Sequence, residues 1–186
     1  MKLAVKNMVC GRCLLVVRQQ LQALNFNVKD IGLGWVEIEP EANADQLNTI
    51  TSAFKVVGFE LIDDYKTKLV EQIKNIITHT VQHSDLSELN LNFSTLLTEK
   101  LQKAYSYLSN LFSEQEDNTI EHYIIQQKVE KIKELMEYND LNLNEIAFKM
   151  GYSSSAHLSA QFKKITGFSP SSYRTKKVGR KALDKL

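Results

Sequence analysis

The chain has 186 residues, of which 43% are hydrophobic and 24% are charged, and these values are ordinary for one or two folded domains. No run of about 18 apolar residues occurs, so we expect no membrane-spanning helix. The formal net charge is only +1, but residues 119–186 carry twelve basic and seven acidic side chains, whereas residues 1–118 are net acidic. A positive carboxyl-terminal segment is what binding to a polyanion such as DNA requires.

The cysteine usage and the amino terminus indicate where the protein works. Only Cys10 and Cys13 occur, which argues against the disulfide framework of an extracellular domain. Lys2 and Lys6 precede this pair without the apolar segment that a secretory signal needs. We therefore expect a cytoplasmic protein.

The first 64 residues alternate between short strand and helix patterns. Leu3 and Val5 share one face of a predicted strand, and apolar residues then recur at helical spacing from Leu14 to Leu24. The predicted elements are a strand at 2–8, a helix at 13–24, hairpin strands at 28–31 and 35–38, a helix at 45–57 and a strand at 59–62. This β-α-β-β-α-β order predicts a ferredoxin-like domain at residues 1–64.

The segment MVCGRC lies between the first predicted strand and the first helix. In this position it resembles the M-x-C-x-x-C loop of heavy-metal-associated domains, which copper chaperones and soft-metal pumps contain. The resemblance covers residues 1–64 and implies a metal site at Cys10 and Cys13, with Met8 packed under the loop. Thiolates are favoured at a helix amino terminus and select soft metals, so Cu(I) is the expected ion. Zinc is less favoured because two sulfurs leave its tetrahedral site two ligands short.

Two other interpretations of the cysteine pair stay open. An exposed dithiol of low pKa can act as a redox switch without any metal. The pair could also be a structural remnant of a metal-binding ancestor. Comparing the Cu(I) affinity of the wild type with that of a variant in which both cysteines are serine distinguishes a metal site from these two interpretations.

Helical patterns dominate residues 65–186. A helical stretch at 65–81 follows the first domain directly, and further helices are predicted at 105–112 and at 119–138, with Thr119 as the N-cap of the latter. We expect the two halves of the chain to be coupled, because little linker separates them.

The stretch 143–174, LNEIAFKMGYSSSAHLSAQFKKITGFSPSSYR, contains two short helix patterns around a tight turn and a third helix that a proline starts. Asn142 and Glu145 are spaced as a capping box for the first of these helices. Gly151 stands where a helix-turn-helix needs a small residue for its reversal. Ser153 or Ser154 can cap the second helix, predicted at 154–165.

Residues 146–174 resemble the carboxyl-terminal signature of AraC/XylS-type transcription regulators, in which an IA-x3-G-F/Y segment precedes F-K-K and G-x-S/T-P-x-x-Y/F-R segments. The resemblance implies two helix-turn-helices joined by one long helix. It places the first reading helix at 105–112 and the joining helix at 119–138, with Asp117 where relatives usually carry glycine. The expected fold class is therefore α+β, a ferredoxin-like domain followed by an all-α double helix-turn-helix domain at 65–186.

The resemblance also implies which side chains meet DNA, because the second helix of a helix-turn-helix enters the major groove. For the second reading helix and the end of the signature, the implied residues are Ser154, Ser155, Ala156, His157, Ser159, Ala160, Gln161, Lys163, Lys164 and Arg174. Lys163 and Lys164 are placed for phosphates, which position the protein without specifying sequence. Ala160 replaces an arginine that is frequent in the family, so a thymine methyl contact is expected there instead of a guanine pair.

The first reading helix is less suited to DNA. Its implied contact residues are Tyr105, Ser106, Ser109 and Asn110, of which Asn110 could pair with adenine. No lysine or arginine occurs between residues 104 and 118, and the acidic side chains at the end of this segment repel phosphates.

These patterns predict a sequence-specific DNA-binding transcription regulator that responds to a soft metal such as Cu(I) through its amino-terminal domain. We expect no enzyme, because the sequence lacks GxSxG, P-loop and HExxH motifs. The expected partner is double-stranded promoter DNA, with no membrane, and a homodimer is left open. Two alternatives remain: a metallochaperone-like protein fused to a helical interaction module, and a thiol redox-sensing regulator.

Overall fold

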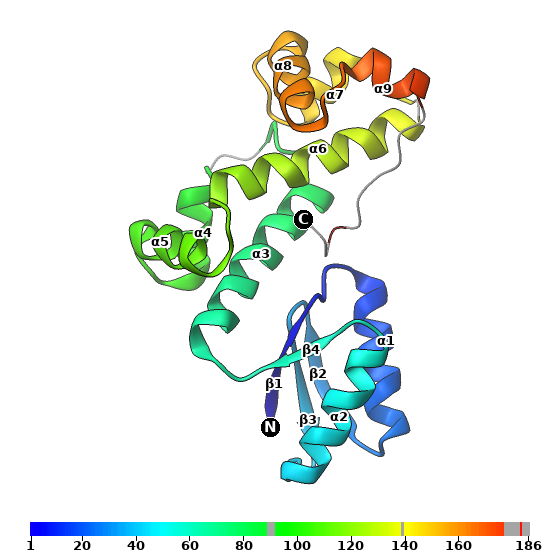
Figure 1. The fold of residues 1–186 in the computed structure, drawn as a ribbon, viewed down its shortest axis with the longest axis vertical. Coiled ribbons are helices and arrows are strands. Elements are labelled where there is room, and N and C mark those ends of the chain that lie inside the picture. The colour runs from blue at the N-terminus through cyan, green and yellow to red at the C-terminus, as the bar shows by residue number, and fades with distance from the viewer. Residues whose placement is uncertain (89–91, 139, 177–182, 184–186) are drawn as a thin grey trace. The chain divides into compact units, whose positions relative to one another are not determined.

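The computed structural model describes residues 1–88, 92–138, 140–176 and 183 (Figure 1). The chain divides into two compact units, Met1–Ile76 and Ile77–Leu186, and the division lies inside helix α3 (Tyr65–His83). The predicted domain boundary at residue 64 stays a prediction. Within the described ranges, no helix is both long enough and apolar enough to cross a membrane.

The first unit contains an antiparallel sheet of four strands and two helices before α3. The elements are β1 (Lys2–Lys6), α1 (Gly11–Ala23), β2 (Asn27–Gly32), β3 (Trp35–Glu39), α2 (Ala44–Val56) and β4 (Glu60–Ile62). The strands are ordered β2-β3-β1-β4, and Leu3 pairs with Val36 while Val5 pairs with Leu61. This is the predicted β-α-β-β-α-β order, whereas the ferredoxin-like assignment itself stays a prediction.

The core of the first unit lies between one face of the sheet and the helices α1 and α2 (Figure 1). The strands contribute to this core through their alternating side chains, because every second side chain points to this face of the sheet. The fully buried members are Val5, Met8, Val17, Leu21, Val36, Ile38, Ile50 and Phe54. Met8 therefore packs in the core under the cysteine loop, as predicted.

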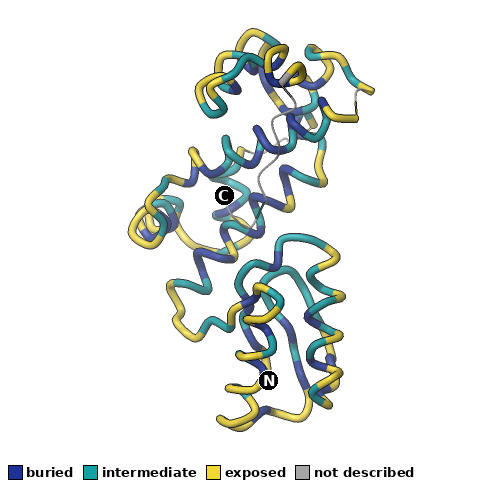
Figure 2. The backbone as a smooth tube through the Cα atoms, turned by 45° about the vertical axis from the view of Figure 1, so that its right-hand side comes forward, coloured by how far each residue is buried: buried dark blue, intermediate teal, exposed yellow. Residues whose placement is uncertain are grey.

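The second unit is helical. Its elements after α3 are α4 (Phe93–Leu101), α5 (Tyr105–Gln115), α6 (Ile120–Tyr138), α7 (Leu143–Lys149), α8 (Ser155–Thr166) and α9 (Pro170–Lys176). Helix α6 contacts both α5 and α8, and buried positions therefore recur on several of its faces (Figure 2). The predicted helices at 65–81, 105–112, 119–138 and 154–165 are all present, with ends that differ by a few residues. Helix α4 was not among the predicted elements.

Candidate nucleic-acid interface and cysteine pair

Helices α7 and α8 form a helix-turn-helix whose start and turn are fixed by the predicted residues. The Asn142 side chain accepts hydrogen bonds from the backbone of the first turn of α7, and the Glu145 carboxylate accepts from the Asn142 N–H at 2.7 Å. This is the predicted capping box. Gly151 turns the chain at φ +69°, a conformation that residues with a Cβ adopt at a cost.

Two contacts from outside α7 and α8 hold this turn in place. The Leu86 N–H donates to the Lys149 carbonyl at 3.0 Å, and the Lys128 ammonium on α6 donates to the Met150 carbonyl at 3.0 Å. Both acceptors are carbonyls at the end of α7, which have no partner within that helix. Burial lowers the pKa of Lys128, so this bond costs some desolvation of the ammonium. No local sequence pattern indicates either contact, because the two partners of each are distant along the chain.

Helix α8 separates buried from accessible side chains as the sequence predicts. Leu158 and Phe162 are fully buried and fasten the helix, and the Ser154 hydroxyl caps it by accepting from the His157 N–H at 3.1 Å. The accessible positions include Ala156, His157, Ala160, Lys163 and Lys164, while Ser155, Ser159 and Gln161 are half-buried. Arg174 lies exposed on α9. These positions are accessible to different degrees, and their contact with DNA stays a prediction.

Two of the residues predicted to contact DNA, Gln161 and His157, already have contacts inside the protein. The Gln161 carbonyl oxygen accepts from the Tyr152 hydroxyl at 2.5 Å, which leaves its amide hydrogens as the donors for a partner. The His157 ring packs edge-on against Tyr152 at 5.4 Å between centroids and lies 3.2 Å from the Ser153 hydroxyl. Tyr152 is therefore a positioning residue for the reading face, which the sequence alone did not indicate. Burial raises its pKa to about 12, so its hydroxyl stays a donor at neutral pH.

Helices α4 and α5 form a second, more weakly marked helix-turn-helix. The turn between them places Gln102 at φ +53°, the conformation that Gly151 adopts in the other pair. Leu108, Leu111 and Phe112 form the buried face of α5, as predicted. At the far end of α5, Glu116 is extended and Asp117 has no positive φ. The glycine usual in relatives is thus not needed at this position.

The accessible face of α5 carries few groups suited to phosphate. Ser106 and Asn110 are exposed, and Tyr105 and Ser109 are half-buried. The Tyr105 hydroxyl donates to the Glu121 carboxylate on α6 at 2.5 Å. Burial, together with this hydrogen bond, raises the pKa of Tyr105, and the same bond lowers the pKa of Glu121. Glu121 thus stays ionised and adds negative charge next to Tyr105, a residue predicted to contact DNA.

The thiols of Cys10 and Cys13 lie together where helix α1 begins. Their sulfurs are 3.3 Å apart, and Cys10 is the N-cap of the helix. Burial raises the pKa of the Cys10 thiol, but the Cys13 N–H, the Cys13 thiol, the Arg12 N–H and the Arg12 charge together hold it below its ordinary value. Burial and the bond to Cys10 raise the pKa of Cys13.

This donor set fits a soft metal better than a hard one. Both cysteines are only partly buried, and the lowered pKa of the Cys10 thiol favours the thiolate form that ligates metals. Among the described residues, no group of three or more His, Cys, Asp or Glu side chains could hold a metal ion. The pair therefore supplies two ligands, which suits two-coordinate Cu(I) rather than tetrahedral zinc.

Comparison with known proteins supports the helix-turn-helix assignment in the helical half of the chain. Residues 97–176 match a family model described as a helix-turn-helix domain. The chain is 34% identical over 106 residues to the Msm operon regulatory protein of Streptococcus mutans, an alignment that covers 56% of this chain and 35% of that protein. It is 28% identical over 120 residues to the uncharacterized HTH-type transcriptional regulator YtdP of Bacillus subtilis, covering 63% of this chain and 15% of that one.

A solved structure gives the same assignment. The C-terminal domain of AraT, a response regulator from Geobacillus stearothermophilus, superposes with a TM-score of 0.50 at 26% identity, covering 61% of this chain and 88% of that one. The carboxyl-terminal region therefore contains an AraC-type helix-turn-helix domain. The chain spans only 15% and 35% of the two curated relatives that it matches.

Proposed function

We propose that this chain, whose residues 97–176 form an AraC-type helix-turn-helix domain, is a sequence-specific DNA-binding transcription regulator. The observation that carries the proposal is the division of α8 into a buried stripe and an accessible face. Leu158 and Phe162 fix the helix, and the face with Ala156, His157 and Ala160 is open to a major groove. The helix-turn-helix family model and the related transcription regulators support a function that is not enzymatic.

The roles within α8 follow from side-chain chemistry. Lys163 and Lys164 near its end contribute phosphate contacts and hence affinity, whereas His157 and Gln161 contribute donors to base edges. The alanines at 156 and 160 suit thymine methyl groups. Helix α5, with acidic neighbours and no cation of its own, contributes less to affinity than α8.

Selection from randomised DNA duplexes tests the proposal and yields the operator needed for further measurements. We expect an enriched site, and an affinity whose logarithm falls linearly with the logarithm of salt concentration at about −0.9 per phosphate neutralised. Changing Lys163 and Lys164 to alanine should flatten this slope by about 1–2 without altering the selected sequence. The matched control is Lys55→Ala on α2, an exposed lysine outside the interface.

The His157→Ala variant separates specificity from charge. It should relax the preference at one or two base pairs while the salt slope stays unchanged, and His83→Ala on α3 is its control. Failure to enrich any duplex, or a slope and preference that neither variant changes, would show that α8 does not lie in the groove.

The cysteine pair supports a second element of the proposal, a soft-metal site with Cu(I) as its preferred ion. What supports it is the pair of sulfurs 3.3 Å apart at the start of α1, one of them acidified. Cu(I) titration against a competing chelator should show tight binding that Cys10→Ser/Cys13→Ser abolishes. Equal Cu(I) affinities of the wild type and the double variant would rule out a metal site at these cysteines.

The two alternatives have their own signatures in the same experiments. For a metallochaperone fused to an interaction module, Cu(I) binds but leaves the operator Kd unchanged. For a redox-sensing regulator, oxidation of the two thiols to a disulfide changes the operator Kd, and Cu(I) does not.

A further inference from the structure

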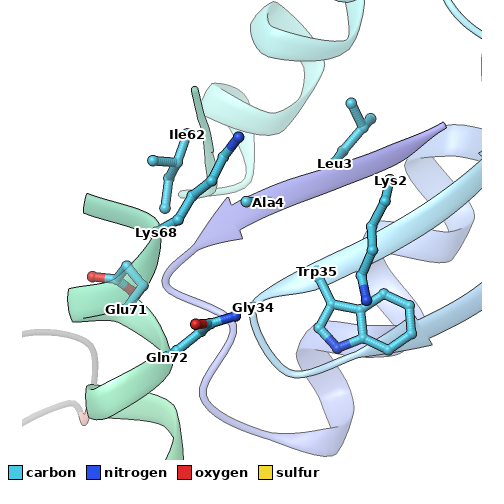
Figure 3. A pocket seen from close by; sticks show the side chains of 9 residues that line it. All are labelled: Lys2, Leu3, Ala4, Gly34, Trp35, Ile62, Lys68, Glu71 and Gln72. Carbon is cyan, nitrogen blue, oxygen red and sulfur yellow. The ribbon is translucent and has the colours of Figure 1, made fainter. Parts of the chain in front are cut away.

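A cavity of about 330 Å³ lies on the sheet face of the first unit that points away from α1 and α2 (Figure 3). Its residues are Lys2, Leu3, Ala4, Gly34, Trp35, Ile62, Lys68, Glu71 and Gln72. The hollow exists because Ala4 and Gly34 fill little space between the larger side chains of Trp35 and Ile62. Its size is at the lower end of the range for small-molecule sites.

The aromatic wall of the cavity is held in place from two sides. A Cβ atom at Gly32 would lie 2.6 Å from the Trp35 indole nitrogen, so the ring rests directly on the backbone of β2. The Lys2 ammonium lies 3.6 Å from the ring centroid, a cation–π contact. Because these contacts already restrict the Trp35 ring, a ligand that packs beside it costs little further side-chain freedom, which favours binding.

The polar groups around the cavity are mostly donors. Lys68 reaches over it from α3, and its carboxylate neighbour Asp63, at 3.8 Å, is fully exposed and contributes little attraction. The Gln72 amide points toward Gly34, whereas the Glu71 carboxylate points away from Trp35 and lies 3.7 Å from the Lys74 ammonium (Figure 3). The cavity is therefore positive on balance.

An orphaned donor lies at the same edge. The Asn75 amide nitrogen is buried and finds no hydrogen-bond partner among the described atoms, and it lies against Gly34, where a Cβ atom would be only 2.4 Å away. A buried donor without an acceptor is costly and therefore favours occupation of its surroundings by an acceptor.

We propose that this cavity binds a small organic carboxylate with a flat apolar body. The carboxylate pairs with Lys68 and accepts from the neighbouring amides, and the apolar body lies on Ala4 between Ile62 and Trp35. Such a ligand contacts both the sheet and the first half of α3. The proposal does not depend on DNA binding or on the cysteine pair.

Trp35 is the only tryptophan of the chain, so its fluorescence reports this site without a label. Titration of the full chain with benzoate should change the Trp35 emission saturably, with a Kd on the order of 0.1–1 mM. Benzyl alcohol, which has the same ring but no charge, should bind at least about tenfold more weakly.

Two variants locate the site, and one serves as control. Lys68→Gln should weaken benzoate binding about tenfold, and Ala4→Val, which fills the hollow with a strand-compatible side chain, should abolish saturation. Lys55→Gln on α2 should bind benzoate as the wild type does. Circular dichroism shows whether Ala4→Val is folded, and Lys68→Gln decides the question if it is not.

Three outcomes would each overturn the proposal: a linear, unsaturable change of emission, equal benzoate affinities for Lys68→Gln and Lys55→Gln, or binding of benzyl alcohol as tight as that of benzoate.

Discussion

Two glycines of the helix-turn-helix formed by α7 and α8 show that a glycine can be needed for backbone conformation alone or for conformation and packing together. Gly151 and Gly167 both adopt the left-handed region, at φ +69° and +79°. At Gly167 a Cβ atom would meet nothing within 4 Å, whereas at Gly151 it would lie 3.1 Å from the Leu86 carbonyl oxygen. Position 151 is therefore restricted to glycine for two independent reasons.

Alanine at these positions separates the two effects. Gly167→Ala should lower the free energy of unfolding by about 1 kcal/mol, the cost of the left-handed conformation. Gly151→Ala should lower it by about 2–4 kcal/mol, because the Leu86 backbone must also move. Urea unfolding followed by circular dichroism measures both. Equal losses of unfolding free energy in the two variants would show that the backbone at Leu86 moves without an energetic cost.

The two thiols differ in acidity although they lie in one motif. The Cys13 thiol lowers the pKa of Cys10 by hydrogen bonding to it, while Cys10 raises the pKa of Cys13 by accepting that bond and by its charge. Because the thiolate is the reactive form, Cys10 should be alkylated at lower pH than an ordinary cysteine.

Removal of either thiol should shift the pKa of the remaining one, and the two shifts should have opposite signs. In Cys13→Ala the alkylation profile of Cys10 should move to higher pH, because the bond that favours its thiolate is lost. In Cys10→Ala the profile of Cys13 should move to lower pH. Iodoacetamide labelling followed by mass spectrometry over a pH series measures both profiles, and shifts of the same sign would contradict the assigned donor and acceptor.

At the scale of helices and strands, the sequence predicted elements that carry a marked start or end. The helix α7 has its capping box at Asn142, and α8 has Ser154 before it and Gly167 after it. Helix α4 is an exception, because it was not predicted although the Asn92 side chain caps its start; Gln102, not glycine, ends it in the left-handed conformation. Helix α5 was predicted through the family resemblance and not from a cap, since its N-cap Ala104 has no side-chain acceptor.

The same contrast holds for the candidate site. Patterns along one helix identified the accessible face of α8 and its buried stripe, which depend on local spacing. The supports of that face, Tyr152, Lys128 and Leu86, act through contacts that no local pattern encodes. The cavity beside Trp35 likewise requires β1, β3, β4 and α3 to meet.

A buried polar network connects helix α6 to α3, and the sequence did not predict this network either. The Tyr123 hydroxyl lies 3.2 Å from the Thr78 hydroxyl and accepts from the Gln127 amide at 3.0 Å. All three side chains are buried, so these hydrogen bonds are shielded from water.

Tyr123→Phe should lower the free energy of unfolding by about 1–3 kcal/mol, because the Gln127 amide loses its acceptor inside the protein. Adding Gln127→Leu should recover part of this loss, since the stranded polar group is then removed. Tyr138→Phe, at a tyrosine that is 69% exposed, should change stability by less than about 0.5 kcal/mol. Additive losses in the double variant would exclude the network as the cause.

At the scale of the whole chain, charge and chemistry are divided between the two ends. Cys10 and Cys13, the proposed soft-metal ligands, belong to the net acidic amino-terminal part, and the excess of basic residues belongs to the part with the helix-turn-helix domain. Helix α3 contributes residues to both compact units without interruption. A metal response therefore requires two arrangements of the chain that differ in DNA affinity. Metal at Cys10 and Cys13 must favour one of these arrangements over the other.

Such coupling is reciprocal and can be measured from both sides. If the chain is a metal-responsive regulator, Cu(I) should change the Kd for the selected duplex by about 5–150-fold, and the duplex should change the Cu(I) affinity by the same factor. Cys10→Ser/Cys13→Ser should retain duplex binding and lose both effects. A duplex Kd that is the same with and without Cu(I), measured alongside tight Cu(I) binding, would instead identify two independent activities on one chain, because a ligand with equal affinity for both arrangements shifts neither.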